Sequence, residues 1–178
     1  MNLAVKKSKP GIPAVSAEEI SKGQIPRHIA IIMDGNRRWA KERFLPVYAG
    51  HKAGAEALRN IVEASADLGV EVLTVFAFSL ENWRRSPDEV NVLLNLFEYF
   101  VKRERVALHR NGIRFQILGR LQDLPGRLLE EFNKTITLTR ENRRLTFNLA
   151  MNYGSRAEIT DAVRGIADEV KQQALSLD

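Results

Sequence analysis

An aspartate, a glycine and two arginines stand close together in Met-Asp-Gly-Asn-Arg-Arg-Trp-Ala, residues 33–40. Asp34 ends an apolar run, Gly35 lets the backbone approach a ligand, and Arg37 and Arg38 come where a helix is expected to begin. Free N–H groups and guanidinium groups at such a place favour phosphate. A lone carboxylate there would repel phosphate, so we expect Asp34 to act with Mg²⁺, which bridges carboxylate and phosphate oxygens. The competing interpretation is that Asp34 only caps the helix.

A second group of reactive side chains stands at residues 78–85, Phe-Ser-Leu-Glu-Asn-Trp-Arg-Arg. Phe78 and Trp83 have two interpretations: packing as core or lid, or an aromatic face beside a cationic reaction centre next to departing pyrophosphate. His51 follows Gly50 near the expected start of a helix, where the helix dipole disfavours imidazolium. We therefore expect a neutral histidine, either donating a hydrogen bond in a site or simply capping or half-buried.

Two apolar runs position these segments. Residues 29–33 and 70–78 are too short and too rich in β-branched side chains for helices, and are typical of strands buried on both faces. The helix between them, residues 50–68, is expected to bury Leu58, Ile61, Val62, Ser65 and Leu68. In such a β-α-β unit, functional residues follow the carboxyl ends of the strands, where Asp34 and residues 79–85 fall.

The remaining chain continues the alternation of strands and helices. Ser86, Pro87 and Glu89 combine an N-cap, a first-turn proline and a capping-box glutamate, and predict a long helix that stops at Asn111-Gly112. Alternating apolar residues predict two half-covered strands, at 113–117 and 145–151.

Two further helices are expected to follow these last strands. Pro125 should open the first, and Ser155 with Glu158 should cap the second. Their expected inner faces are Leu128, Leu129, Phe132 and Ile136 in the first, and Ile159, Val163, Ile166 and Val170 in the second. The predicted architecture is a single α/β domain with a mostly parallel central sheet flanked by helices.

Composition narrows the classes of chemistry and partner. The 178 residues contain no cysteine, which excludes disulfides, thiolate metal sites and a thiol nucleophile. Residues 1–24 are expected to form a flexible arm with one short helix from Ser16, and residues 25–178 the domain. No apolar run is long enough for a membrane span or a secretory signal, so we expect a cytoplasmic protein. The net charge of +5 favours an anionic partner, but without a nucleic-acid-binding motif we do not expect nucleic acid.

The order of the motifs resembles the cis-prenyltransferase family, typified by undecaprenyl diphosphate synthase. The matching segments are residues 25–40, Gly-His-Lys-Ala-Gly at 50–54, Thr-Val-Phe-Ala-Phe-Ser-Leu-Glu-Asn-Trp-Arg-Arg at 74–85 and Asn-Tyr-Gly-Ser-Arg at 152–156. The resemblance covers about residues 25–172. It implies a parallel-sheet α/β fold, a homodimer, Mg²⁺ and a hydrophobic tunnel for the growing chain.

The resemblance also implies roles for individual residues. Asp34 would handle Mg²⁺ and the allylic diphosphate, and would be catalytic together with Asn82. His51 would contact a diphosphate. The expected substrate-binding residues are Gly35, Asn36, Arg37, Arg38, Trp39, Arg43, His51, Phe78, Ser79, Trp83 and Arg85, of which those at 78–85 would, with Asn82, flank the reacting carbons and isopentenyl diphosphate.

The chain departs from the family pattern in two places. Val47 stands where many members have an arginine, and we expect Arg43 or Arg37 to replace that phosphate contact. The family's C-terminal Arg-x-Gly-x-x-Arg-x-Ser-Asn pattern and the acidic metal ligand after it are absent from the 178 residues. We therefore expect a shortened chain that binds the allylic diphosphate but turns over poorly or not at all.

The resulting hypothesis is a Mg²⁺-dependent prenyl transferase that condenses isopentenyl diphosphate with an allylic diphosphate into a cis-polyprenyl diphosphate, and contacts the membrane through its lipid product. The alternatives are a non-catalytic partner subunit, a basic binding module, and a phosphohydrolase with an aspartate nucleophile, against which Asn36 counts because such enzymes need a second acid there. By resemblance, the helix bearing Ala55, the helix after Pro87 and the strand around Leu145 would line the tunnel; ordinary core packing is the alternative. Product length, primer and proton acceptor are not fixed by the sequence.

Overall fold

The computed structural model describes residues 23–172, 174 and 175. Most of the expected arm, with the helix expected at Ser16, lies outside the described residues. The elements are, in order, β1 (His28–Ile32), α2 (Asn36–Lys41), α3 (Val47–Asp67), β2 (Val72–Ser79), the 3₁₀ helix η1 (Leu80–Arg84), α4 (Pro87–Arg110), β3 (Ile113–Leu118), the 3₁₀ helix η2 (Leu121–Asp123), α5 (Gly126–Thr139), β4 (Leu145–Tyr153) and α6 (Ser155–Lys171).

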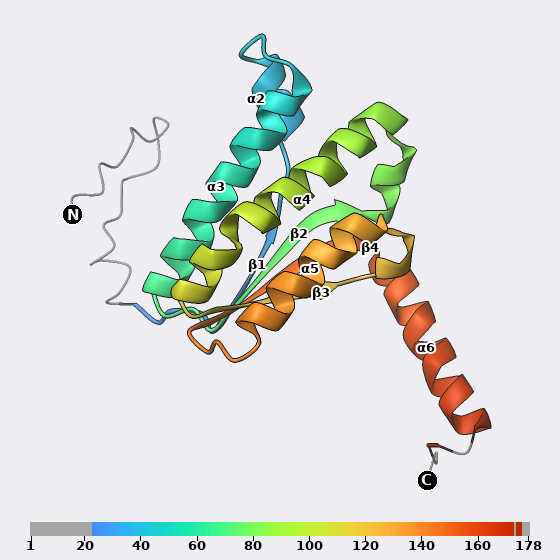
Figure 1. Cartoon of the computed structure of the whole chain (residues 1–178). Helices are drawn as coiled ribbons and strands as arrows, with labels where there is room; N and C mark the ends of the chain where they lie inside the picture. The colour runs from blue at the N-terminus through green and yellow to red at the C-terminus, as the bar shows by residue number, and fades with distance from the viewer. Residues whose placement is uncertain (1–22, 173, 176–178) are drawn as a thin grey trace.

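The four strands form one parallel sheet in the order β1-β2-β4-β3. Helices α3, α4 and α5 lie along one face of this sheet (Figure 1). Because all four strands run the same way, the segments after β1 and β2 meet at one edge, as predicted. The α/β fold with a parallel central sheet is confirmed.

The core lies between the sheet and these three helices. Alternate side chains of the strands point into it, including Leu73 and Val75 of β2 and Phe115 of β3, and all three are buried. Phe132 of α5 packs against Phe115 with ring centroids 6.1 Å apart. The predicted inner face of α5 is confirmed, and α4 begins as predicted, with the Ser86 hydroxyl accepting from the Glu89 N–H at 3.3 Å.

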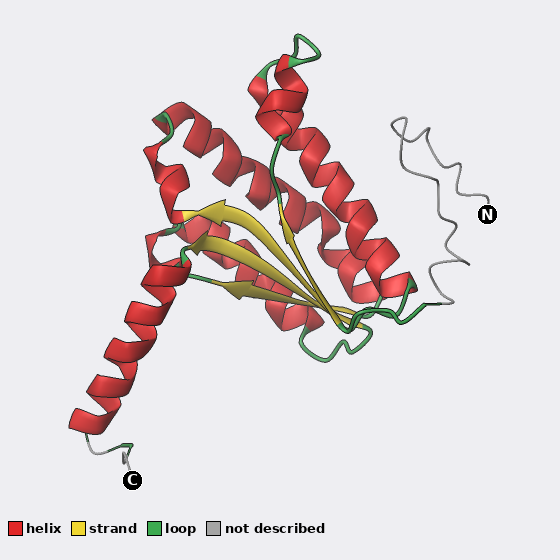
Figure 2. Ribbon diagram, turned by 180° about the vertical axis from the view of Figure 1, so that it is seen from behind, coloured by secondary structure: helices red, strands yellow, loops and turns green. Residues whose placement is uncertain are grey.

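The other face of the sheet differs from the sequence prediction. The run at 29–33 predicted a strand buried on both faces, but in β1 His28, Ala30 and Ile32 are exposed. Figure 2 shows that, among the described residues, no helix covers this face. Polar side chains occupy it, with Thr74 Oγ1 2.8 Å from the imidazole of His28 and 3.2 Å from the Asn148 amide. The apolar run at 29–33 suggested two buried faces, but only every second residue of β1 points into the core.

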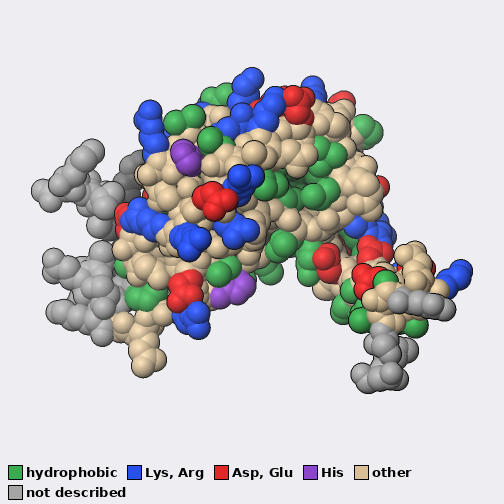
Figure 3. Space-filling view, turned by 60° about the horizontal axis from the view of Figure 1, so that its bottom comes forward, with side chains coloured by type: hydrophobic (Ala, Val, Ile, Leu, Met, Phe, Trp, Pro, Cys, Tyr) green, Lys and Arg blue, Asp and Glu red, His purple; other side chains and the backbone are tan. Residues whose placement is uncertain are grey.

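Helix α6 also corrects a prediction. It extends away from the sheet (Figures 1 and 2), and none of its described residues is buried. Its expected inner face is exposed at Ile159, Val163 and Ile166, and Figure 3 shows hydrophobic side chains between the body and this helix. Gly154, not Ser155, is its N-cap. No helix among the described residues is both long enough and apolar enough to cross a membrane.

Candidate active site

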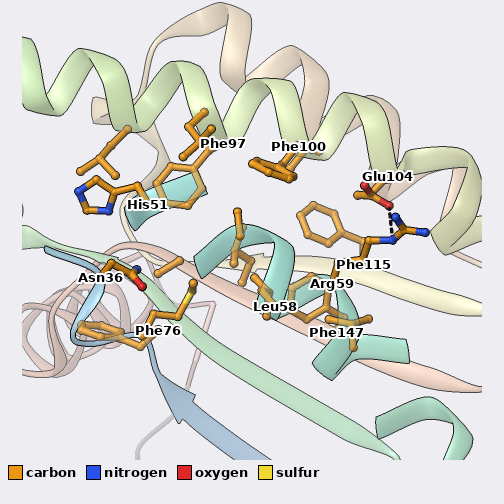
Figure 4. A pocket seen from close by; sticks show the side chains of 18 of the residues that line it. Asn36, His51, Leu58, Arg59, Phe76, Phe97, Phe100, Glu104, Phe115 and Phe147 are labelled. Carbon is orange, nitrogen blue, oxygen red and sulfur yellow. Dashed lines mark ion pairs between the residues drawn. The ribbon is translucent and has the colours of Figure 1, made fainter. Parts of the chain in front are cut away.

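A cavity of about 340 Å³ lies between the sheet and helices α3 and α4. Its interior is apolar, and the side chains there include Ala55, Leu58, Val62, Leu93, Leu96, Phe97, Phe100, Phe115, Phe147 and Leu149. Figure 4 shows Asn36 and His51 at one end, which we call the mouth. At the other end Arg59 Nε is 3.4 Å from Glu104 Oε2. The cavity is within the size range of small-molecule sites.

Helices α3 and α4 and strand β4 line the cavity, as the resemblance implied. Leu145 itself is core, whereas Phe147 and Leu149 of the same strand line the cavity. The tunnel-lining interpretation and the core-packing interpretation of these elements are therefore both partly right, because one strand supplies core residues and cavity residues.

Six of the predicted site residues line the cavity: Asp34, Asn36, His51, Ser79, Asn82 and Arg85. They come from the ends of β1 and β2, from α2 and η1, and from the first turns of α3. The two motif segments, residues 33–40 and 78–85, thus meet at the mouth.

Asp34 follows β1 and its carboxylate is exposed. It accepts from Arg38 Nη2 at 2.9 Å and from the Gly35 N–H at 2.6 Å. These contacts, the Arg38 guanidinium first, lower the pKa of the Asp34 carboxyl. The N-cap of α2 is Gly35 and no side chain caps this helix, so the interpretation of Asp34 as a mere cap is wrong. The carboxylate is ionised and accessible at the mouth.

Asn36 is held by close packing between α2 and α3. A Cβ atom at Gly50 would overlap the Asn36 carbonyl, and a Cβ at Gly54 would lie 2.6 Å from Asn36 Oδ1. Glycine at both positions therefore lets the two helices approach until the Asn36 side chain reaches the cavity.

His51 is buried and its Nε2 has no hydrogen-bond partner among the described residues. Burial first, and then the nearby charge of Arg85, lowers the pKa of His51. The neutral form agrees with the prediction, but the cause differs, because α3 begins at Val47 and places His51 inside the helix. A buried polar atom without a partner is rare in folded proteins and is suited to contacting a ligand.

Glu89 does not line the cavity but contacts residues at its mouth, and the capping-box pattern predicted a different role for it. Its Oε1 lies 3.0 Å from Arg85 Nη1 and 3.7 Å from His51 Nε2, and its Oε2 lies 3.8 Å from Arg37 Nη1. The capping box predicted a carboxylate turned back to the helix N-terminus; instead it links three cationic or ionisable groups. The arginine four residues before Glu89 was the signal that could have revealed this contact.

Ser79 and Asn82 form a capping box around η1. The Asn82 Oδ1 accepts from the Ser79 N–H at 3.1 Å, and the Ser79 side chain accepts from the Asn82 backbone. This reciprocal pair fixes both side chains where β2 ends, and both line the cavity.

Phe78 and Trp83 do not line the cavity. Phe78 is completely buried, edge-to-face with Trp83 at 5.4 Å and with Phe97 at 6.4 Å between ring centroids. Trp83 Nε1 donates to Asn152 Oδ1 at 2.7 Å, and Asn152 is itself buried. Phe78 therefore packs in the core beside the cavity, with its buried ring against two other aromatic rings, as one of its two interpretations expected.

The remaining predicted residues do not line the cavity: Gly35, Arg37, Arg38, Trp39 and Arg43. The Arg43 guanidinium lies 4.4 Å from the centre of the Trp39 ring, and it also pairs with Glu42. Of the two replacements expected for an arginine at position 47, Arg37 is therefore better placed, because it reaches Glu89 at the mouth.

The residues at the mouth fit Mg²⁺ in one particular way. No group of three or more histidine, aspartate or glutamate side chains in the described part of the chain could enclose a metal ion. Mg²⁺ is commonly bound by one or two carboxylates together with substrate phosphates. Asp34, a single accessible carboxylate beside cationic side chains, fits that mode.

The comparisons with known proteins agree with this geometry. Residues 32–177 match the prenyltransferase family model described as "Putative undecaprenyl diphosphate synthase". The isoprenyl transferase of Heliobacterium mobile is 50% identical over 151 residues, which cover 85% of this chain and 58% of that protein. The isoprenyl transferase of Streptococcus pyogenes serotype M1 is 46% identical over 166 residues, 93% of this chain and 66% of that protein. The chain thus spans less than two thirds of the length of these relatives.

Solved structures give the same result. Lavandulyl diphosphate synthase from Lavandula x intermedia, in complex with dimethylallyl diphosphate, matches with a TM-score of 0.80 and 35% identity over 85% of this chain and 65% of that one. A probable undecaprenyl diphosphate synthase from Campylobacter jejuni matches with a TM-score of 0.66 and 28% identity, over 85% and 64%. Together with the match to the family model, these likenesses establish that the chain belongs to the cis-prenyltransferase family of undecaprenyl diphosphate synthases.

Proposed function

We propose that the chain binds an allylic diphosphate with the diphosphate at the mouth and the prenyl tail in the apolar interior, and that it is an enzyme that transfers the prenyl group to isopentenyl diphosphate. The observation that carries this proposal is a single cavity with an apolar interior and a mouth bearing Arg85, the unpartnered His51 Nε2 and Asp34. A matched relative was crystallised with dimethylallyl diphosphate, a molecule with this same combination of charged head and apolar tail.

The reaction breaks the C–O bond between the allylic carbon and the diphosphate and forms a C–C bond to isopentenyl diphosphate, which then loses a proton. Arg85 and Arg37 would bind the departing diphosphate, and the neutral His51 would donate a hydrogen bond from its Nε2–H to a phosphate oxygen. Mg²⁺, held by Asp34 and phosphate oxygens, would offset further negative charge. The apolar walls exclude water that would otherwise quench the allylic cation.

The polar and charged side chains at the mouth also have to be oriented before the ligand binds. Glu89 holds Arg85 and, at longer range, Arg37, so these guanidinium groups are oriented without a bound anion. Asn82 and Ser79 stay fixed by their capping box, and both line the cavity. We propose Asn82 as the residue next to the reacting carbons on this basis. Preorganised groups lower the barrier because they need not rearrange during the reaction.

The quaternary structure and location are proposals that rest on the family. A homodimer, a cytoplasmic location and peripheral contact with the membrane through the lipid product follow from the resemblance. Sedimentation of the purified chain tests the first, and cell fractionation tests the other two. The phosphohydrolase alternative finds less support, because the residue two positions after Asp34 is Asn36 and not the second acid that such enzymes need.

Incorporation of labelled isopentenyl diphosphate into butanol-extractable product tests the transfer. We expect product that depends on Mg²⁺ and on an allylic primer, whereas release of phosphate without labelled product would support a phosphohydrolase. Binding of the allylic diphosphate with little or no product is the outcome expected if the C-terminal Arg-x-Gly-x-x-Arg-x-Ser-Asn pattern, absent from the 178 residues, is needed for transfer, and it is also the outcome for a non-catalytic partner subunit. Cis geometry is read from the double bonds of the product by nuclear magnetic resonance.

A further inference from the structure

The turn from α2 to α3 exposes five large apolar side chains. The exposed fractions are 98% for Phe44, 49% for Tyr48, 43% for Leu45 and 37% each for Trp39 and Val47. We call these five residues the tip. Figure 1 shows this turn at the extreme end of the molecule, beyond the end of α2 and away from the sheet. Five exposed apolar side chains of this size within residues 39–48 favour an interaction surface.

Phe44 occupies an unfavourable backbone conformation in this turn. Its φ of 54° is in the left-handed region, which a bulky residue rarely adopts. The Phe44 N–H donates to the Lys41 carbonyl and the Leu45 N–H to the Ala40 carbonyl, the hydrogen bonds of a Schellman motif in which glycine is usual at the position of Phe44. The side chain is almost wholly exposed, so no packing in the described residues offsets the strain.

Basic side chains flank the tip. Lys41, Arg43 and Lys52 are exposed beside it, with Glu42 as the acidic neighbour. Arg43 Nη1 lies 3.7 Å from Glu42 Oε2, so Lys41 and Lys52 carry the excess of positive charge. Elsewhere basic and acidic groups are mixed, as Figure 3 shows for the face that it displays. The tip therefore combines apolar side chains with an excess of positive charge. Tryptophan and tyrosine, both present in it, are enriched where proteins meet the membrane–water interface.

We propose that the tip docks on an anionic lipid bilayer, with Phe44 and Leu45 inserted among the lipids and Lys41 and Arg43 at the phosphate headgroups. A bilayer is favoured over a globular protein because the most exposed side chain, Phe44, projects from a convex turn. A stable protein interface, in contrast, buries about 800 Å² of surface on each partner. Insertion would place the strained phenylalanine in an apolar environment. It would also bring the cavity mouth near the lipid, because α2 begins at Asn36, which lines the cavity. The docking does not depend on the proposed catalysis.

Vesicle flotation of the purified 178-residue chain tests this proposal. The probe is phosphatidylcholine vesicles with about 30% phosphatidylglycerol, compared with pure phosphatidylcholine. Phe44→Gly should lower the bound-to-free ratio about tenfold, because it removes the inserted ring. Its thermal stability should be unchanged or higher, since glycine adopts the left-handed conformation without strain. Leu138→Ser, at an apolar residue of α5 that is 40% exposed, close to the 43% of Leu45 in the tip, is the control and should bind like the wild type.

A pair of charge reversals tests the electrostatic part. Lys41→Glu should lower binding to anionic vesicles about tenfold, whereas Arg110→Glu, at the far end of α4, should have little effect. Wild-type binding by a folded Phe44→Gly, or equal binding to neutral and anionic vesicles, would overturn the proposal. A third outcome would also overturn it: the wild-type chain does not bind vesicles but associates with itself, and Phe44→Gly abolishes that self-association. The tip would then bind a second copy of the chain.

Discussion

At the mouth of the cavity, Glu89 holds Arg85 and lies near His51 and Arg37. The interior, in contrast, which includes Ala55 and Phe100, offers a ligand only apolar side chains. The mouth presents charged groups in a fixed arrangement, and each group there depends on its neighbours. The interior presents only apolar side chains, so neighbouring side chains can substitute for one another. We therefore expect changes at the mouth to act on the chemistry and changes in the interior to act on which tail is accepted.

The largest effect is expected at the mouth. Asp34→Ala should lower prenyl transfer about 10³-fold, the range found when a main electrostatic stabiliser is removed. It should also abolish the Mg²⁺ dependence of allylic diphosphate binding. Circular dichroism should show an intact fold, because the carboxylate is exposed and its contacts are local. Near-wild-type transfer, or a chain that no longer folds, would contradict the role of Asp34.

A change in the interior should have a smaller and more selective effect. Ala55→Leu adds three carbons to a side chain that lines the cavity, and should weaken binding of a prenyl diphosphate about tenfold or more. Inorganic pyrophosphate, which has no tail, should bind as it does to the wild type. Ala57→Leu makes the same change on the exposed side of the same helix and is the matched control. Equal weakening of both ligands would mean that the two regions are not separate.

Trp83 stands outside the cavity and should affect stability first. Trp83→Phe keeps an aromatic ring against Phe78 but loses the hydrogen bond to Asn152, at a cost of about 1 kcal/mol in the free energy of unfolding. Chemical denaturation measures this loss, and binding of the allylic diphosphate should change little. A large loss of allylic diphosphate binding without a loss of stability would show that Trp83 belongs to the binding site.

The smallest expected effect is a shift in the titration of His51. Its pKa lies below the ordinary value because of burial and Arg85, so neutral His51 stabilises the fold above the unfolded pKa near 6.5. That stabilisation is lost as the pH falls through the folded pKa. The Glu89 carboxylate acts in the opposite direction, so Glu89→Gln should lower the pKa of His51 further. Nuclear magnetic resonance of the imidazole measures the shift; a rise in the variant would show that Glu89 does not act on His51.

Local signals predicted the parts of the molecule that depend on local sequence. The apolar runs located β1 and β2, Ser86 and Pro87 located the start of α4, and the parallel strands then required that the two motif segments meet. The exposed second face of β1 was missed because a run of apolar residues does not reveal which side is covered.

Contacts between distant segments could not be read from the sequence in the same way. The approach of Glu89 to Arg37 and His51 depends on how α2, α3 and α4 pack together. The burial of Phe78 likewise depends on Phe97, which comes from another element. The Schellman turn with Phe44 in the left-handed region lacks the glycine that would have marked it.

Calorimetric titration of the 178-residue chain with three ligands, in the presence of Mg²⁺, tests the central claim most directly. The ligands are an allylic diphosphate, inorganic pyrophosphate and the corresponding prenyl alcohol. If the mouth binds the head and the interior binds the tail, the allylic diphosphate should bind at one site at least about tenfold more tightly than either part alone. Pyrophosphate binding as tightly as the allylic diphosphate, or no binding of the latter, would contradict the assignment of this cavity as a prenyl diphosphate site.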